Sequence, residues 1–201
     1  MIDYSKIIAA GLNLDIDYQR MTYELVGAKE SSKCVPFTYK SDNQDCHSFS
    51  LFLRENKTMP QYSYRGAKLA ELDGWEWDNS LDIPYTISVI NNLPIKKLGT
   101  VRAVYFPDIP CIEHTDWDDS SNLKNTLGLS LIPATGNTHC NVWSEKQSDY
   151  VSIHGHAMLL NDSIRHNVPK ANGLRITVRV FGEIDYEQFT DKIIPDSLHY
   201  M

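Results

Sequence analysis

The sequence predicts a mainly β fold with flanking helices, in which short strands form a barrel or a jelly-roll sandwich. After residue 100 the chain consists of short apolar runs separated by turn-forming residues, a texture typical of antiparallel β proteins and not of alternating βαβ units. The segment 175–181 also alternates polar and apolar residues, as a strand with one buried face does. The expected strands cover residues 100–107, 111–117, 126–132, 140–145, 150–154, 157–161, 165–169 and 175–184.

The first hundred residues are predicted to be helical or irregular. Apolar residues recur at helical spacing within residues 1–30, and residues 31–60 are rich in turn formers. A second helix is expected to begin at Pro84, because proline suits the first helical position, and to end by residues 91–94.

The chain is long enough, at 201 residues, to bury one core without disulfide or metal support. We therefore expect one structural domain, with an N-terminal segment at 1–99 that braces a barrel core at 100–185, followed by a tail at 186–201. The four cysteines have no CxxC spacing, which argues against a zinc ribbon. The oligomeric state is left open.

Charge and hydropathy exclude some partners. A formal net charge of -7 argues against a nucleic-acid partner, because such binding depends on clustered Lys and Arg. No apolar run approaches the roughly 20 residues needed to cross a bilayer, so no membrane partner is expected. The first 25 residues lack a basic and then apolar leader, and we expect a cytoplasmic protein that acts on a small molecule.

A candidate metal site lies in the second expected strand. In a strand, residues i and i+2 point to the same face, so His114 and Asp116 can offer an imidazole and a carboxylate to one metal. His166 would supply the third ligand. Two His and one carboxylate are typical of non-haem Fe(II) oxygenases. A His-x-Asp pair alone is common, and two polar residues on a solvated strand face are the alternative. The polar face formed by Arg175 and Thr177 favours the site.

Four segments carry a resemblance to a known family. They are Asp82–Tyr85, Val104–Pro107, Ile112–Asp116 and Gly155–Val168. On these segments, residues 75–185 resemble the aspartyl/asparaginyl β-hydroxylase family of Fe(II)- and 2-oxoglutarate-dependent dioxygenases, which includes proline cis-hydroxylases.

The resemblance implies a double-stranded β-helix, the jelly roll of cupin-like proteins. It implies that His114, Asp116 and His166 bind Fe(II), and that Arg175 with Thr177 binds the distal carboxylate of the cosubstrate 2-oxoglutarate. Dioxygen would be the oxidant. The implied reaction couples oxidative decarboxylation of 2-oxoglutarate, which gives succinate and carbon dioxide, to hydroxylation of an unactivated C–H bond.

One family feature is missing. Family members carry an Arg-x-His pair on the third core strand that helps to hold the second carboxylate of 2-oxoglutarate, whereas residues 126–133 contain neither residue. Tyr105, Ser130, Asn141 and Arg179 are candidates for this role, and the sequence does not choose among them.

The substrate is expected to be a free amino acid or a close derivative. Arg65, Arg102 and Arg165 are candidate anchors for its carboxylate, and Trp117 is placed at the pocket edge because it follows the metal motif. Two other functions stay open. One is hydroxylation of Asp, Asn or Pro side chains in a protein or peptide, and the other is a cupin-like metal-binding domain without catalytic activity.

Overall fold

The computed structural model describes residues 2–30, 34–41, 44–56, 74–106, 110–115, 127–134, 140–161, 163–170 and 173–201, with side chains omitted at 37–41, 44–47, 127 and 134. The helices are η1 (Tyr4–Lys6), α1 (Tyr18–Glu30), α2 (Pro84–Asn91), η4 (Tyr186–Lys192) and η5 (Pro195–Ser197). The strands are β1 (Ile7–Leu12), β2 (Val35–Ser41), β3 (Gln44–Asn56), β4 (Trp75–Trp77), β5 (Ile95–Phe106), β6 (Cys111–His114), β7 (Leu127–Ala134), β8 (Cys140–Ser144), β9 (Asp149–Ile153), β10 (Ala157–Asn161), β11 (His166–Val168), β12 (Arg175–Ile184) and β13 (His199–Tyr200).

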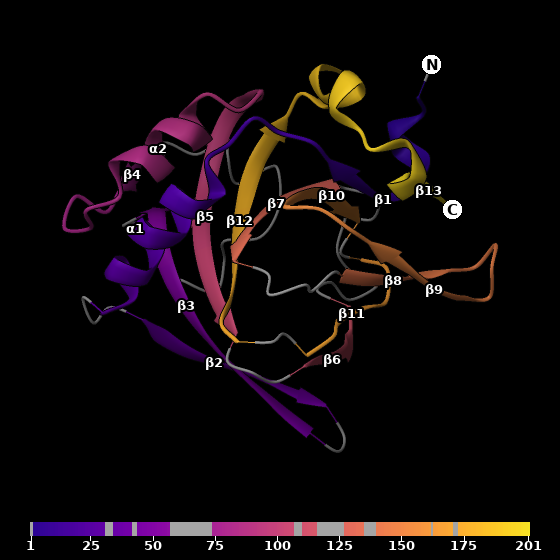
Figure 1. Cartoon of the computed structure of the whole chain (residues 1–201), viewed down its shortest axis with the longest axis horizontal. Coiled ribbons are helices and arrows are strands. Elements are labelled where there is room, and N and C mark those ends of the chain that lie inside the picture. The colour runs from indigo at the N-terminus through magenta and orange to yellow at the C-terminus, as the bar shows by residue number, and fades with distance from the viewer. Residues whose placement is uncertain are drawn as a thin grey trace.

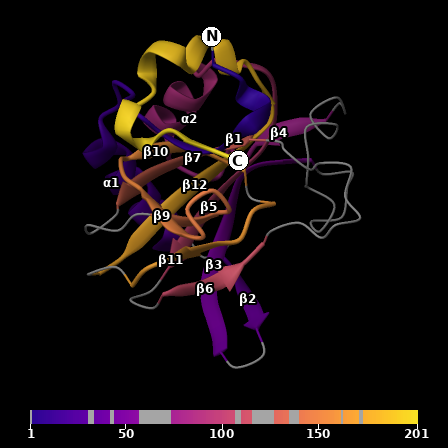
Figure 2. The same cartoon turned by 90° about the vertical axis from the view of Figure 1, so that its right-hand side faces the viewer.

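Two antiparallel sheets face each other. The large sheet has the order β13-β1-β10-β7-β12-β5-β3-β2, with β4 paired to β3, and the small sheet has the order β6-β11-β8-β9. Helices α1 and α2 lie on one side of the large sheet and the small sheet lies on the other (Figure 1). Figure 2 shows β9, β11 and β6 in front of the large sheet. This arrangement is the predicted jelly roll.

The large sheet separates two layers of buried side chains. On its helix side, Ile176, Val178 and Val180 of β12 pack in a core that includes Met21 and Leu25 of α1. On the other side, a second core joins apolar side chains of both sheets. Because strand residues alternate between faces, β12 turns its apolar residues toward the helices and its polar residues toward the small sheet.

The expected strands after residue 100 are confirmed as β5 to β12. The predicted helix at Pro84 is also confirmed, with the proline in its first turn. The amides of Tyr85 and Thr86 donate to the carboxylate oxygens of Glu24 in α1, each at 2.8 Å. Glu24 thus caps α2 from the neighbouring helix, since the first amides of a helix have no partner within it.

The helical prediction for residues 1–30 is wrong over Ile7–Leu12, which form the fully buried strand β1. A strand buried on both faces is continuously apolar, so its sequence has no period that separates it from a helix. The irregular prediction for residues 31–60 is also wrong where β2 and β3 pair antiparallel. Strands before and after residue 99 therefore belong to one sheet.

The C-terminal residues join the same sheet, because β13 pairs with β1. In the part of the chain that the structure describes, no helix is both long and apolar enough to cross a membrane.

Candidate functional site

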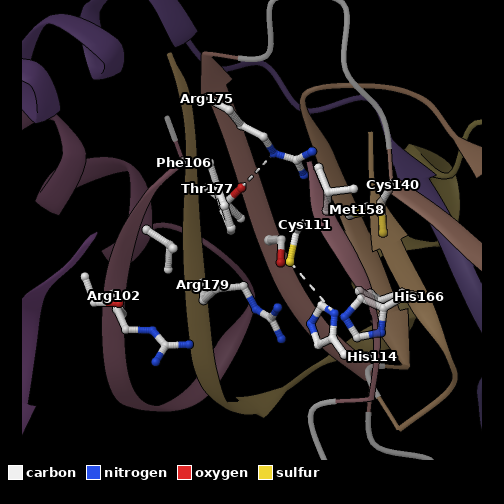
Figure 3. A pocket seen from close by; sticks show the side chains of 15 residues that line it. Arg102, Phe106, Cys111, His114, Cys140, Met158, His166, Arg175, Thr177 and Arg179 are labelled. Atoms are coloured by element: carbon white, nitrogen blue, oxygen red, sulfur yellow. Dashed lines mark hydrogen bonds between the residues drawn. The ribbon is translucent and has the colours of Figure 1, made fainter. Parts of the chain in front are cut away.

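A cavity lies between the two sheets, and Figure 3 shows the side chains that line it. The large sheet contributes the lining residues Ser50, Arg102, Val104, Phe106, Ser130, Met158, Leu160, Arg175, Thr177 and Arg179. The small sheet contributes Cys111, His114, Cys140, His166 and Val168. The cavity therefore contains two of the three predicted metal ligands together with the predicted anion anchor.

The two histidines face each other across neighbouring strands. His114 of β6 and His166 of β11 are Cα partners in the antiparallel register, and their ring centroids lie 4.3 Å apart. His114 Nδ1 lies 2.7 Å from the carbonyl oxygen of Ile112, and His166 Nδ1 lies 2.8 Å from that of Ile164. A carbonyl oxygen only accepts, so each Nδ1 carries a proton.

This tautomer suits metal binding. With the proton on Nδ1, the lone pair of each neutral ring is on Nε2, and histidines that bind metals usually donate their other ring N–H to a carbonyl or carboxylate. The backbone of each strand therefore fixes both the tautomer and the direction of its ring. The donor set of His114 and His166 fits two positions around a divalent metal such as Fe(II).

The third predicted ligand, Asp116, lies outside the described residues, as do Trp117 and Arg65. Within the described ranges, no group of three or more His, Cys, Asp or Glu side chains could hold a metal ion. The role of Asp116 thus remains a prediction from the sequence.

Arg175 is buried in the cavity wall, with only 2% of its surface exposed. Its Nε donates to Thr177 Oγ1 at 3.3 Å, while its buried Nη1 has no hydrogen-bond partner among the described residues. Burial is the largest cause that lowers the pKa of Arg175, to about 10, and the charge of Arg179 also lowers it. The guanidinium is therefore charged at neutral pH. A buried charged donor without a partner suits an anionic ligand.

Tyr105 does not line the cavity, contrary to its predicted role beside the cosubstrate. Its hydroxyl donates to the carbonyl oxygen of Leu25 in α1 at 2.8 Å, and burial raises the pKa of the phenol. Neighbouring residues on a strand point to opposite faces. Because Val104 and Phe106 face the cavity, Tyr105 must face the helices.

Tyr105→Phe is expected to lower the free energy of unfolding by about 1 kcal/mol, the typical net value of one buried hydrogen bond. Its affinity for 2-oxoglutarate should not change, since the phenol lies on the helix side of the sheet. Urea denaturation and calorimetric titration measure the two quantities. A large loss of cosubstrate affinity at unchanged stability would return Tyr105 to the site.

Arg165 is not among the residues that line the cavity, so the described structure does not support its predicted role as a substrate anchor. Its Nη1 lies 3.1 Å from Glu113 Oε1, and its guanidinium lies 4.7 Å from the ring centroid of Trp143. Arg165 immediately precedes His166, so the two side chains point to opposite sides of the small sheet.

Asn141 is likewise absent from the cavity wall. Its amide nitrogen donates to Asn167 Oδ1, and its amide oxygen accepts from Ser152 Oγ. Of the residues predicted beside the cosubstrate or the substrate, Arg102, Ser130, Thr177 and Arg179 do line the cavity. The sequence analysis did not identify Val104 and Phe106 as lining residues, although they share the i, i+2 spacing of Arg102.

No family model matches the sequence, and no curated protein is similar to it in sequence. Among solved structures, it is similar to an oxidoreductase of the 2OG-Fe(II) oxygenase family from Burkholderia pseudomallei, with 9% identity, a TM-score of 0.51 and 89% of each chain covered. It is also similar to a Pseudomonas putida prolyl-4-hydroxylase, with 11% identity, a TM-score of 0.49, and 87% of this chain and 90% of that chain covered. The first likeness supports the jelly-roll fold, and at such identities it supports the fold alone.

Proposed function

We propose that this chain is an Fe(II)- and 2-oxoglutarate-dependent dioxygenase that hydroxylates a small polar substrate. One observation carries the proposal. The buried guanidinium of Arg175, with Nη1 lacking a partner among the described residues, lines the same cavity as two histidines whose Nδ1 atoms are held by backbone carbonyls. Binding of 2-oxoglutarate in such an enzyme requires a cation for its distal carboxylate and a metal that it can chelate. Arg175 and the two histidines offer both in one cavity.

In this proposal His114 and His166 hold the iron through Nε2, and Asp116 supplies the carboxylate ligand. When bound, the iron supplies the activation of dioxygen that couples decarboxylation of 2-oxoglutarate to C–H hydroxylation. The backbone carbonyls of Ile112 and Ile164 keep both rings oriented before the metal binds. Such preorientation lowers the entropic cost of assembling the site.

Arg175 binds the distal carboxylate of 2-oxoglutarate. Its planar guanidinium can make two parallel hydrogen bonds to a carboxylate, and the bond from Nε to Thr177 Oγ1 fixes the plane of the group. Apolar side chains surround this position, since Val104, Phe106 and Met158 belong to the same wall. They limit the access of water and strengthen charge interactions inside the cavity.

The sequence motifs favour the aspartyl/asparaginyl β-hydroxylase family and, within it, an enzyme similar to the proline cis-hydroxylases. A free amino acid or a close derivative is then the favoured substrate. The position of the cavity between the two sheets supports a small molecule, because the described lining residues come from both sheets.

The test is succinate formation by purified protein supplied with Fe(II), 2-oxoglutarate and air, against free amino acids and short peptides. We expect succinate release that requires Fe(II) and rises with one free amino acid. Absence of release with every substrate would reject the dioxygenase. Stimulation by peptides alone would retain the dioxygenase and reject the free amino acid.

A further inference from the structure

A second pair of arginines lines the cavity beyond Arg175. Arg102 of β5 and Arg179 of β12 are Cα partners in the antiparallel register, and Arg179 is also the partner of Ser130 on β7. All three side chains line the cavity. Directly opposite side chains on one face have Cβ atoms roughly 4.5–5.5 Å apart, and like charges in that position repel each other. The sheet thus places two cations side by side at the cavity wall.

This pair is separate from the proposed cosubstrate anchor. Arg175 and Arg179 are four residues apart on β12, which corresponds to about 13 Å along a strand. The two arginines also have different neighbours, since Arg175 Nε donates to Thr177 Oγ1, whereas Arg179 is the register partner of Arg102. Figure 3 shows Arg175 at one end of the cavity, whereas Arg179 extends from β12 toward the side that carries the two histidines.

The surroundings of the pair favour an anion. The described lining residues include three arginines and neither Asp nor Glu, and the charge of Arg179 contributes to the lowered pKa of Arg175. Each guanidinium has five N–H donors, enough to serve a contact within the protein and a bound carboxylate at the same time. The hydroxyl of Ser130 can add a further donor. A carboxylate between Arg102 and Arg179 would offset their repulsion.

We propose that Arg102 and Arg179, with Ser130 beside them, form a second anion subsite that binds a carboxylate of the hydroxylated substrate. This inference rests on the proposed function, in which Arg175 is assigned to 2-oxoglutarate. It gives Ser130 and Arg179, which the sequence analysis considered for the cosubstrate, to the substrate instead. It makes the substrate a carboxylic acid, held on the side of the cavity toward which Arg179 extends. The same acid with its carboxylate converted to a carboxamide is then a poor ligand, because it loses its charge.

The test is calorimetric titration of the Mn(II)-loaded protein without oxygen. The protein is titrated first with 2-oxoglutarate and then, at saturation, with L-amino acids that have uncharged side chains and with their α-carboxamides. We expect at least one amino acid to bind, and its carboxamide to bind at least roughly tenfold more weakly, as loss of hydrogen bonds to a charged group predicts.

Two variants and a control assign the subsite. Arg102→Gln and Arg179→Gln are expected to weaken amino-acid binding by roughly tenfold or more and to leave the Kd of 2-oxoglutarate unchanged. Arg175→Gln should have the reverse effect. Arg54→Gln is the matched control, because Arg54 is a partly buried arginine that lies over Trp77 and is not among the cavity residues. It should change neither affinity.

Three results overturn the subsite. They are equal binding of acids and carboxamides, absence of binding by every amino acid, and variants of Arg102 or Arg179 that weaken 2-oxoglutarate instead of the amino acid. Failure of the proposed function looks different, because 2-oxoglutarate itself then fails to bind or binds independently of Arg175. In that case the Mn(II)-loaded protein is titrated with the amino acids alone. Weaker amino-acid binding by Arg102→Gln and Arg179→Gln would still support the subsite, and unchanged binding would reject it.

Discussion

Arg175→Met is expected to abolish 2-oxoglutarate binding and, at the same time, to stabilise the ligand-free protein. Burial removes the charged guanidinium of Arg175 from water, and its Nη1 has no hydrogen-bond partner among the described residues. An unsatisfied buried polar group costs about 1–3 kcal/mol, and more if it is charged. Methionine fills similar space without charge, so the free energy of unfolding should rise by about 1–3 kcal/mol.

The pH range in which Arg175→Met raises the free energy of unfolding follows from the direction in which the pKa of Arg175 is shifted. The pKa of Arg175 is lowered from its ordinary value to about 10 in the folded protein, so both the folded and the unfolded chain carry the charge below pH 10. The destabilisation is therefore constant across neutral pH and is relieved only as the pH rises above about 10 toward the ordinary pKa of arginine. Urea denaturation of metal-free protein at pH 7 measures the gain, and calorimetry measures the loss of 2-oxoglutarate binding. Arg165→Met, at an exposed arginine outside the cavity, is the control. Reduced stability with unchanged cosubstrate affinity would contradict the assignment.

His166→Ala is expected to eliminate specific Fe(II) or Mn(II) binding and the succinate formation that depends on it. Loss of a hydrogen-bonding partner of a metal ligand typically weakens binding by about 10–100-fold, and loss of the ligand itself should exceed that. His166 is 3% exposed, so some loss of stability is also expected from the vacated space. Circular dichroism of the variant separates unfolding from loss of the metal.

His156→Ala is the matched control for this variant. His156 Nδ1 also lies within hydrogen-bond distance of a carbonyl oxygen, that of Ile132 at 3.0 Å, but its ring stacks on Tyr18 and does not line the cavity. Metal affinity should be retained in this variant. Equal metal affinity in His166→Ala and the parent protein would show that the histidine pair is not the metal site.

The strands that the sequence predicted correctly include one whose polar and apolar residues alternate. In β12, alternation separates Arg175, Thr177 and Arg179 from the apolar residues between them, and the structure places the two sets on opposite faces of the sheet. Strand β1 has no such period, because all of its residues are buried. The sequence analysis therefore assigned it to a helix.

Two candidates for the site lie outside the cavity for a different reason. Tyr105 and Arg165 were candidates for their chemistry, but each is directly adjacent to a lining residue and so points away from the cavity. Asp116 and Trp117 lie outside the described residues, and their roles stay predictions. The arginine pair could not be seen in the sequence, because Arg102 and Arg179 become neighbours only through the register of β5 and β12.

The position of β1 has a consequence for biosynthesis. This strand lies between β10 and β13, and the amide of Gly11 donates to Ser197 Oγ at 2.8 Å. One edge of β1 therefore stays unpaired until β13 has been synthesised, and the contact of Gly11 with Ser197 spans 186 residues. Contacts so distant in the chain form slowly, because a long loop must close before they are made. Until then Ile7–Leu12 is an apolar strand with open edges, the kind of segment on which chains associate. Completion of this sheet is expected to follow synthesis of β13, and chaperones that shield apolar segments would act on residues 7–12 until then.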